Sequence, residues 1–330
     1  MIELDDLRKT SHRDDGDVVV LSGVDLYVDT GGIYGVVGTP ADGTTMLLRC
    51  VNLLDRPDEG TVRVDGLDLT LARPSQLRVA RHAIGMIGSP VGLLEQRSVS
   101  RNVAMPLAFA GIRVRQRDLY VDEILDQVGL ADRADAYPAD LDPEEVARTA
   151  VARALVSCPR VLLCDEPTAG LEPAAAEAIL VLLRDLATSL GVTVLLATRD
   201  YDVVKAVCDS VALLRAGRIV DHGRVTDLLD RSDSELAGGL LPGLPAATPQ
   251  TVGATLQADL TFLGNRAHGP VLTETARAYG VDLTVVAGSI QTICGLSVGR
   301  LRVELTGPGE DCQRALLRFA DLNLTPKVLI

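Results

Sequence analysis

Features that define several common protein classes are missing from this sequence of 330 residues. No apolar run approaches the roughly 20 residues that a membrane-spanning helix needs. The start of the chain, MIELDDLRKT, is acidic where a secretory signal peptide is basic. The net charge of −13 leaves no basic stripe for a phosphate backbone. We therefore expect a cytoplasmic protein that binds no nucleic acid.

Paired cysteine motifs are missing as well. The six cysteines are Cys50, Cys158, Cys164, Cys208, Cys294 and Cys312. They form no C-x-x-C pair, and several lie inside apolar runs such as VLLCDE. We predict that they are reduced thiols of the core.

The pattern of apolar and turn-forming residues divides the chain. From Ile2 to about Arg231, β-rich apolar runs alternate with helical stretches, as in an α/β domain with a largely parallel sheet. The stretch GGLLPGLPAATP is dense in glycine and proline, which cannot continue a helix or a central strand. We predict an α/β nucleotide-binding domain over residues 1–237, a linker over 238–254 and a second domain over 255–330. The second domain reads strand, helix, two strands, helix, strand, which predicts a small α+β ferredoxin-like fold.

The segment GTPADGTT lies between an apolar strand and an apolar helix, where a phosphate-binding loop is expected. The template for such a loop is G-x-x-x-x-G-K-[ST], in which the lysine reaches the β- and γ-phosphates. Gly38, Gly43 and Thr45 fit the template, but Thr44 stands in place of the lysine. We predict that these four residues form a degenerate phosphate loop.

An acidic pair follows a second apolar strand, in RVLLCDEP. In this arrangement the first carboxylate, Asp165, holds Mg²⁺, and the second, Glu166, orients or deprotonates a water. Taken by itself, the segment RVLLCDEP could be a strand that happens to end in two acidic residues before a proline turn. Its place after GTPADGTT, with TAGLEP following, favours the functional interpretation.

These motifs resemble the ATP-binding subunits of ABC importers, specifically the methionine importer type. The matching segments are IYGVVG, LLRCVNLLDRPDEGTVRVDG, VARALVSCPRVLLCDEPTAGLEP and YDVVKAVCDSVALL. The resemblance implies a P-loop NTPase (ABC ATPase) domain followed by an ACT-like ligand-sensing domain. It implies ATP and Mg²⁺ as cofactors, with Thr45 and Asp165 as metal ligands and Glu166 as base.

The resemblance also implies partners and a location. An integral-membrane permease would dock on the first domain, and a second ATP-binding subunit, identical or paralogous, would pair with it. A hydrophobic amino acid would bind the C-terminal domain. The chain would then be peripheral at the inner face of the cell membrane.

Departures from the family fall on the residues that touch nucleotide. Pro40 removes a backbone N–H from the phosphate nest, and Ala41 adds a Cβ where the family has glycine. Asp42 adds a negative charge. Two interpretations stay open: Asp42 repels phosphate, or it points into solvent while backbone N–H groups still hold phosphate weakly.

The family's signature, L-S-G-G-Q, binds the γ-phosphate of the partner subunit through its serine and the amides of a helix N-terminus. Here it reads LDPEE, which comprises Leu141, Asp142, Pro143, Glu144 and Glu145. Asp142 suits an N-cap, Pro143 suits the first turn, and the glutamates complement the helix dipole. We expect a helix start whose own carboxylates repel an incoming phosphate, hence a degenerate signature.

Four further positions depart from the family. Ser89 stands where a glutamine senses Mg²⁺ and water, and Arg199 stands where the switch histidine is expected. Arginine cannot titrate near neutral pH as histidine does. Ser11 replaces the aromatic residue that stacks on adenine, and Glu172 replaces an aspartate, a milder change.

The combined losses predict a pseudo-ATPase with a structural or regulatory role at a permease, with weak or absent binding of ATP and Mg²⁺ and an idle Glu166. Two alternatives remain open. The chain could be an active transport ATPase for methionine uptake, with Arg199 supplying the missing charge. It could also be a soluble amino-acid sensor.

The C-terminal domain is expected to keep its activity. Residues from about Leu256 to Ile330 should dimerise and bind a small hydrophobic amino acid between the copies, because the sheet has exposed edges and a second face. Gly280, Gly288 and Gly295 either allow the close backbone approach of that cleft or only make turns.

Overall fold

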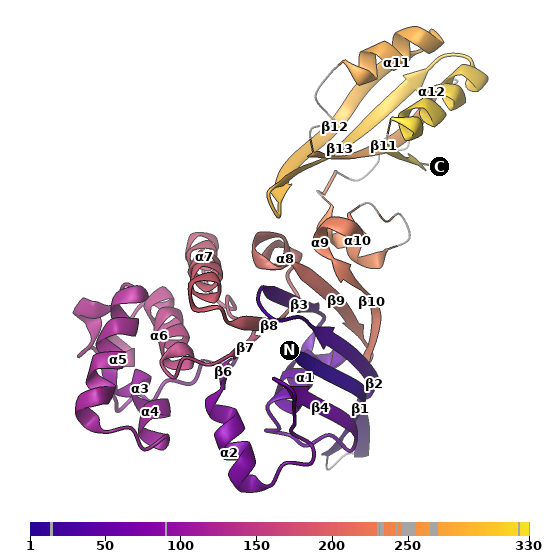
Figure 1. Cartoon of the computed structure of the whole chain (residues 1–330). Coiled ribbons are helices and arrows are strands. Elements are labelled where there is room, and N and C mark those ends of the chain that lie inside the picture. Colours follow the sequence, from indigo (N-terminus) through magenta and orange to yellow (C-terminus); the bar gives the residue numbers. More distant parts are fainter. Residues whose placement is uncertain are drawn as a thin grey trace. The chain divides into compact units, whose positions relative to one another are not determined.

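The computed structural model of the chain describes residues 1–13, 16–89, 91–229, 231, 234–241, 243–245, 255–264, 270–322 and 324–329. They form two compact units, Met1–Gly223 and Arg224–Ile330, each with its own hydrophobic core (Figure 1). The expected domain limits stay predictions. Residues 242 and 246–254 of the expected linker lie outside the described residues.

A parallel sheet forms the centre of the first unit. Its strands are β3 (Ile33–Val37), β6 (Ile84–Ile87), β7 (Val161–Asp165), β8 (Thr193–Thr198), β9 (Ser210–Arg215) and β10 (Arg218–Arg224). Their order is β10-β9-β3-β8-β7-β6, and β9, β3, β8, β7 and β6 pair in parallel. Every residue of β7 and β8 is buried, as in a strand covered on both faces. The predicted parallel sheet is confirmed.

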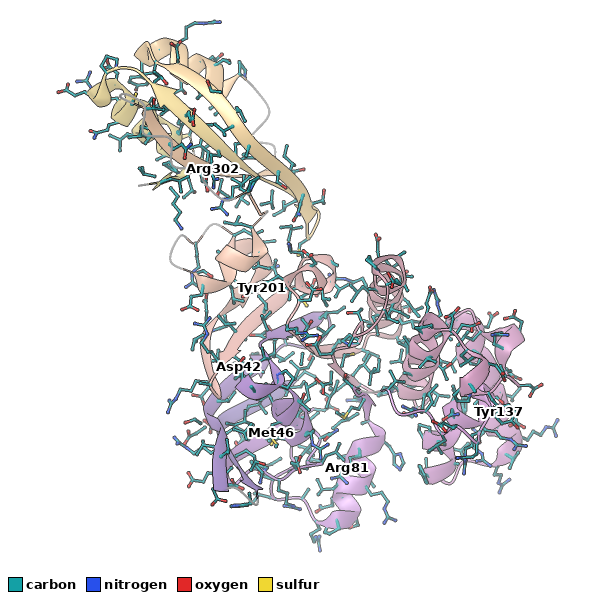
Figure 2. All side chains as sticks on the ribbon, turned by 180° about the vertical axis from the view of Figure 1, so that it is seen from behind. Asp42, Met46, Arg81, Tyr137, Tyr201 and Arg302 are labelled. Atoms are coloured by element: carbon teal, nitrogen blue, oxygen red, sulfur yellow. The ribbon has the colours of Figure 1, made fainter. Side chains whose placement is uncertain are left out.

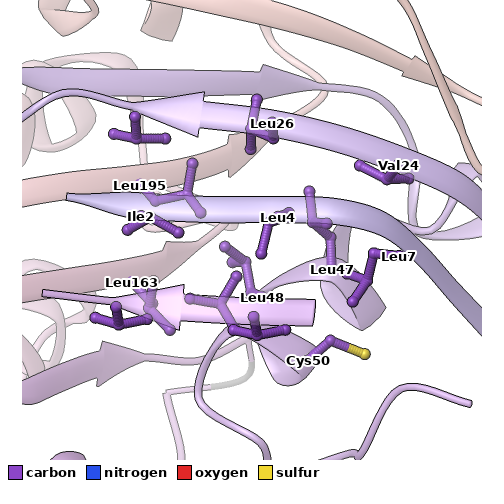
Figure 3. Packing of buried hydrophobic residues seen from close by; sticks show 14 of the residues in the cluster. Ile2, Leu4, Leu7, Val24, Leu26, Leu47, Leu48, Cys50, Leu163 and Leu195 are labelled. Atoms are coloured by element: carbon purple, nitrogen blue, oxygen red, sulfur yellow. The ribbon is translucent and has the colours of Figure 1, made fainter. Parts of the chain in front are cut away.

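A second, antiparallel sheet was not separated from the first by the sequence pattern. It comprises β1 (Ile2–Arg13), β2 (Gly16–Val28), β4 (Glu59–Val64) and β5 (Leu67–Asp68), in the order β2-β1-β4-β5. Helix α1 (Thr44–Val51) contacts strands of both sheets. Its Leu47 and Leu48 are fully buried in the cluster that includes Leu4, Leu163 and Leu195 (Figure 3). This packing fixes the start of α1, and with it the candidate phosphate loop.

Helices complete the first unit. They are the short 3-10 turns η1 (Pro40–Asp42), η2 (Ala131–Arg133) and η3 (Pro138–Asp140), and α2 (Pro74–His82), α3 (Val99–Val103), α4 (Met105–Phe109), α5 (Val114–Gln127), α6 (Pro143–Leu155), α7 (Pro173–Leu190) and α8 (Tyr201–Val207). Helices α3, α4 and α5 pack against α6 (Figure 1). Within the described residues, no helix is both long enough and apolar enough to cross a bilayer.

The second unit contains α9 (Val225–Leu228), α10 (Glu235–Leu240), β11 (Thr255–Leu263), α11 (Val271–Tyr279), β12 (Asp282–Ile293), β13 (Leu296–Thr306), α12 (Gly309–Asp321) and β14 (Thr325–Leu329). From β11 onward this is the predicted strand, helix, two strands, helix, strand. The sheet order is β12-β13-β11-β14, with antiparallel pairs. Ala258 and Leu260 of β11 share a core cluster with Phe319 of α12. The ferredoxin-like fold is confirmed.

Two expectations need correction. Glycine does not stop the helix at residue 238, because α10 runs through Gly238 to Leu240. Ser234 caps this helix by accepting from Ala237 N at 3.1 Å, and Leu236 and Leu240 are buried, which offsets the low helix propensity of glycine.

The cysteines are the second correction. All six are free, and Cys50, Cys164, Cys208 and Cys312 are buried as expected. Cys158 and Cys294 are exposed. Both have φ of 49°, in turns that follow α6 and β12, and such turns lie at the surface.

The three glycines of the second unit have local explanations. Gly280 ends α11 and Gly295 lies in the turn between β12 and β13, with φ of 65° and 76°. At Gly288, a Cβ would lie 2.6 Å from Leu301 Cδ2 within the same sheet. Turn geometry and strand packing therefore account for all three.

Candidate nucleotide site

The magnesium edge of the site brings together two of the predicted residues. Thr45, in the first turn of α1, donates to Asp165 Oδ1 at the end of β7, at 3.2 Å. Asp165 is buried, and burial raises the pKa of its carboxyl group, against the smaller effects of the Thr45 hydrogen bond and the Arg49 charge. A hydroxyl and a carboxylate oxygen are ligands that Mg²⁺ accepts, with water completing its shell. This pair fits the metal.

Glu166 lies at the same edge in a strained backbone conformation, with φ of 48°. Its carboxylate accepts from Arg199 N at 3.0 Å and from Thr198 Oγ1 at 3.2 Å. Burial raises the pKa of Glu166, and these two hydrogen bonds oppose the rise. The carboxylate is thus tied to the loop after β8, where the backbone of Arg199, not its exposed side chain, makes the contact.

The phosphate loop holds a carboxylate of its own. Asp42 Oδ2 accepts from Thr39 N at 2.9 Å and from Thr39 Oγ1 at 2.6 Å. Its other oxygen accepts from Ala216 N at 3.1 Å, in the turn between β9 and β10 (Figure 2). Hydrogen bonds, first that of the Thr39 hydroxyl, lower the pKa of Asp42. Asp42 is therefore held by hydrogen bonds to the loop and to the turn after β9, and the interpretation that backbone N–H groups still hold phosphate weakly stays open.

Other amides of the loop are also engaged. Asp42 N donates to Thr39 O at 2.9 Å and Gly43 N to Pro40 O at 3.2 Å, which closes the η1 turn. Gly38 N donates to Thr198 O at 3.0 Å. A phosphate nest needs amides that point at the ligand, and Pro40 has none to offer.

The retained glycines and Thr44 have structural roles. A Cβ on Gly38 would lie 2.7 Å from Leu214 O, and one on Gly43 would lie 2.8 Å from Val20 O. Gly43 also has φ of 104°. Thr44, at the lysine position, is buried and donates its hydroxyl to Thr39 O at 3.2 Å. The loop therefore needs these glycines with or without phosphate.

The start of α6 carries the altered signature. Asp142 is the N-cap: its side chain accepts from Glu145 N at 2.8 Å, and Glu145 accepts from Asp142 N at 3.0 Å. Arg133 donates two hydrogen bonds to the Glu145 carboxylate, from Nε at 2.8 Å and from Nη2 at 3.0 Å. These bonds lower the pKa of Glu145. Glu144 pairs with Arg148 at 2.7 Å. The expected self-capped helix start is confirmed, with Leu141 directly before it and Pro143 in its first turn.

The remaining predicted positions lie apart from these contacts. Ser89 is exposed in the segment after β6, and Ser11 lies in β1 opposite Val18 of β2. Glu172 stands at the N-cap of α7. The roles predicted for Ser89, Ser11 and Glu172 stay predictions, which measurements of nucleotide binding and ATP turnover can test.

Sequence reasoning missed two partners of the site. Arg133 holds the signature from a position twelve residues away, a spacing that marks no local motif. Ala216 meets Asp42 from a distant turn. One local signal was available: Thr39-x-x-Asp42 follows the capping-box pattern, and the Asp42 carboxylate accepts from Thr39 N as that pattern predicts.

Comparison with known proteins agrees with this architecture. The ABC transporter family matches residues 21–169, and the NIL domain family matches residues 257–328. The methionine import ATP-binding protein MetN of Thermobifida fusca is 44% identical over 324 residues, 98% of this chain and 98% of that protein. MetN of Streptomyces avermitilis is also 44% identical, over 319 residues, 94% of this chain and 90% of that protein.

Solved structures match the first part of the chain. The dimeric structure of a bacterial ABC transporter cassette has a TM-score of 0.63 at 27% identity, covering 68% of this chain and 98% of that chain. A dimeric ATP-binding cassette in a post-hydrolysis state, bound to ADP and Pi, gives a TM-score of 0.63 at 26% identity, with the same coverage. The P-loop fold of an ABC ATPase is confirmed. The chain belongs to the family of ABC importer ATP-binding subunits, which includes the methionine import ATP-binding proteins.

Proposed function

We propose that this importer-type subunit has lost ATP hydrolysis and serves as a structural or regulatory subunit at a membrane permease. The observation that carries the proposal is the carboxylate of Asp42 in the phosphate loop, which already accepts from Thr39 N of the loop and from Ala216 N of the turn between β9 and β10. An entering phosphate would have to displace this carboxylate and would meet its charge. At 4 Å, each unit charge is worth on the order of 4 kcal/mol at an effective dielectric of about 20, so the repulsion is substantial.

The signature supports the same proposal. A composite site between two ATP-binding subunits takes its phosphate loop from one chain and its signature from the other. The side chains of Asp142 and Glu145 accept from two amides at the start of α6, those of Glu145 and Asp142, and place negative charge where a γ-phosphate would bind. A homodimer would lack both halves of each site. A pair with an intact paralogue would still lack one half of each.

The permease partner follows from the family, since ABC importer ATP-binding subunits work with a membrane permease and dimerise. The first unit offers a pocket of about 690 Å³ lined by α2, α4 and α6. Its lining combines apolar Phe109 with Arg78, Arg81 and Arg153, of which Arg81 is labelled in Figure 2. Such a surface suits an amphipathic segment of a permease, which would place the chain at the inner face of the membrane.

A second candidate function is an active transport ATPase for methionine uptake. The specific observation in its favour is the assembled magnesium edge, where Thr45 meets Asp165 and Glu166 keeps a pKa raised by burial. A metal bound here would neutralise phosphate charge. Glu166 would have to leave Arg199 N to reach a water.

Turnover of Mg-ATP by the purified full chain separates the two candidates. We expect a rate no higher than that of a Glu166→Gln control, because carboxylates of the chain itself already bind amides in both phosphate-binding elements. Loss of even one preorganised donor costs about 10² to 10³ in rate. MetN of Thermobifida fusca serves as the active control. Turnover that Glu166→Gln abolishes would establish the second candidate.

The ligand of the NIL domain is proposed to be a hydrophobic amino acid, with methionine first because of the MetN relatives. The support is the set of exposed apolar side chains of β12, Val285, Val286 and Ile290, which a second copy would cover. Calorimetric titration of the full chain with L-methionine should give saturable heat. L-glutamate is the matched polar control. No heat with methionine, leucine or valine would refute the sensing role without touching the nucleotide proposal.

A further inference from the structure

The sheet of the second unit carries charged side chains on the face opposite α11 and α12. Ala258 and Leu260 of β11 pack in the core beneath these helices, so Asp259 between them points to the other face. Residues directly opposite one another in an antiparallel pair share a face. Arg302 of β13 and Lys327 of β14 are the cross-strand partners of Asp259, so these three side chains form one row across this face.

Arg300 belongs to the same face, because it lies two residues before Arg302 on β13. Its Nη2 donates to Asp259 Oδ2 at 3.0 Å. Arg302, labelled in Figure 2, donates to the same carboxylate from Nε at 2.8 Å and from Nη2 at 3.1 Å. One carboxylate therefore holds two guanidinium groups.

The two rows that contain these arginines carry more positive than negative charge. Their described charged side chains are the cations Arg300, Arg302 and Lys327 and the carboxylate Asp259. The next carboxylate on this face, Glu304, accepts from Gln257 Nε2 at 2.7 Å. The local excess of positive charge contrasts with the net charge of −13 of the whole chain. An anion that binds beside Arg300 would be stabilised by this excess.

The two arginines differ in the donors that they keep. The side chain of Arg302 is 8% exposed, and its third nitrogen donates to Pro245 O at 2.6 Å. The side chain of Arg300 is 21% exposed, and within the described residues Asp259 is its hydrogen-bond partner. A guanidinium has five N–H donors, so Arg300 keeps donors for a second carboxylate.

Apolar side chains continue this face of β13 beyond Arg300. Val298 comes next, with Leu263 of β11 as its cross-strand partner, and Leu296 follows at the end of the strand. Val298 is buried, Leu263 is half-buried and Leu296 is 37% exposed. A cation therefore lies next to an apolar surface. This arrangement suits a ligand that carries a carboxylate and an apolar side chain on the same carbon.

We propose that Arg300 binds the α-carboxylate of the amino acid that the second unit senses, with L-methionine as the ligand. This inference rests on the proposed sensing function and adds a binding residue to it. The guanidinium donates to the carboxylate with the N–H groups that Asp259 does not use. The ligand side chain lies along Leu263 and Leu296. Asp259 is a positioning residue, because it holds the guanidinium in place.

Calorimetric titration of the full chain with L-methionine and with L-methioninamide tests this assignment, because the amide has a neutral group in place of the carboxylate. Arg300→Gln should weaken methionine binding about tenfold to a hundredfold, the loss expected for a hydrogen bond between charged groups. It should not weaken the binding of methioninamide. Arg300→Lys keeps a positive charge and should lose less affinity for methionine than Arg300→Gln, again with no loss for the amide.

Arg314→Gln is the matched control. Arg314 lies on α12, on the other side of the sheet, where it pairs with Asp311 at 3.4 Å and with Glu310 at 3.8 Å. This variant should bind methionine like the original chain. Thermal melts without ligand check that Arg300→Gln is folded, which we expect because Asp259 keeps its two hydrogen bonds from Arg302.

Two outcomes would overturn the assignment and leave the sensing function intact. The first is methionine binding that both Arg300 variants leave unchanged. The second is an equal loss of affinity for methionine and for methioninamide in folded variants, which would show that Arg300 only shapes the sheet. An original chain that binds no methionine would overturn the sensing function itself, and this assignment with it.

Discussion

The carboxylates at the magnesium edge of the candidate site, Asp165 and Glu166, and the carboxylate at its phosphate edge, Asp42, have pKa values shifted in opposite directions. At the magnesium edge, burial raises the pKa of Asp165 and of Glu166. In the phosphate loop, hydrogen bonds lower the pKa of Asp42, and in the signature at the start of α6 the hydrogen bond from Arg133 lowers that of Glu145. Burial opposes the charge of the first pair, hydrogen bonds stabilise it in part, and an external cation would stabilise it further. The second pair is already stabilised by the chain itself.

This difference indicates that the site favours a cation more than a phosphate. A cation would stabilise the charge of Asp165, whereas under the proposed function a phosphate would have to displace Asp42 from Thr39 N and Ala216 N. Binding of Mg-ATP requires both edges at once. The fold around them is intact, so the contrast arises from a few side chains and not from a disordered site.

The largest effect should come from reopening the phosphate edge. Asp42→Ala with Thr44→Lys frees the two amides and restores a cation, whereas Thr44→Lys alone leaves the carboxylate in the loop. We expect the double variant to bind Mg-ATP, and millimolar nucleotide at about 100 times its dissociation constant stabilises by about 2.7 kcal/mol. The rise in melting temperature on adding Mg-ATP measures this stabilisation.

The single variant is the control for that prediction. Thr44→Lys should show little shift, because effects within one site are strongly coupled. An equally large shift in Thr44→Lys alone would mean that Asp42 yields easily and that the two edges differ less than their pKa values indicate.

The folds of both units could be predicted from the sequence because their patterns are local. VLLCD and TVLLAT are uniform apolar runs, and both became fully buried strands. The order of elements in the second unit followed from alternation and turn residues. The antiparallel sheet was missed because its strands pair β1 with β2 and β4, and nothing local distinguishes those pairings from a parallel arrangement.

The site was predictable where spacing alone sets the geometry. The N-cap of α6 follows from Asp142 and Glu145 three residues apart. The contact of Thr45 with Asp165 followed from the family resemblance. Arg133 and Ala216 could not be foreseen, because their contacts depend on how distant turns pack, and no residue pattern records that.

The signature edge should show an intermediate effect. Asp142→Ala removes the N-cap of α6, which typically costs about 1 kcal/mol. Glu144→Ala removes only the i,i+4 pair with Arg148, worth about 0.2–0.5 kcal/mol. Urea unfolding of the two variants measures both losses. A smaller loss in Asp142→Ala than in Glu144→Ala would mean that Glu145 and Arg133 hold the helix start without the cap.

The smallest effect distinguishes the two edges by the sign of their pH dependence. Because the pKa of Asp165 is raised in the folded state, stability falls as pH rises from the unfolded value, about 3.9, through the folded value. Asp165→Asn lacks this loss and can still accept from Thr45. It should melt slightly higher than the original chain near neutral pH, without metal, and the gain should vanish near pH 4.

Asp42→Asn should do the opposite. The pKa of Asp42 is lowered in the folded state, so its contribution is present above the unfolded value and is lost as pH falls through the folded value. The variant should therefore melt lower than the original chain near neutral pH and approach it in acid. Thermal melts of the three proteins in a chelating buffer decide the matter. If both variants shifted the melting temperature in the same direction at neutral pH, the two edges would not differ in the way that their hydrogen bonds and burial indicate.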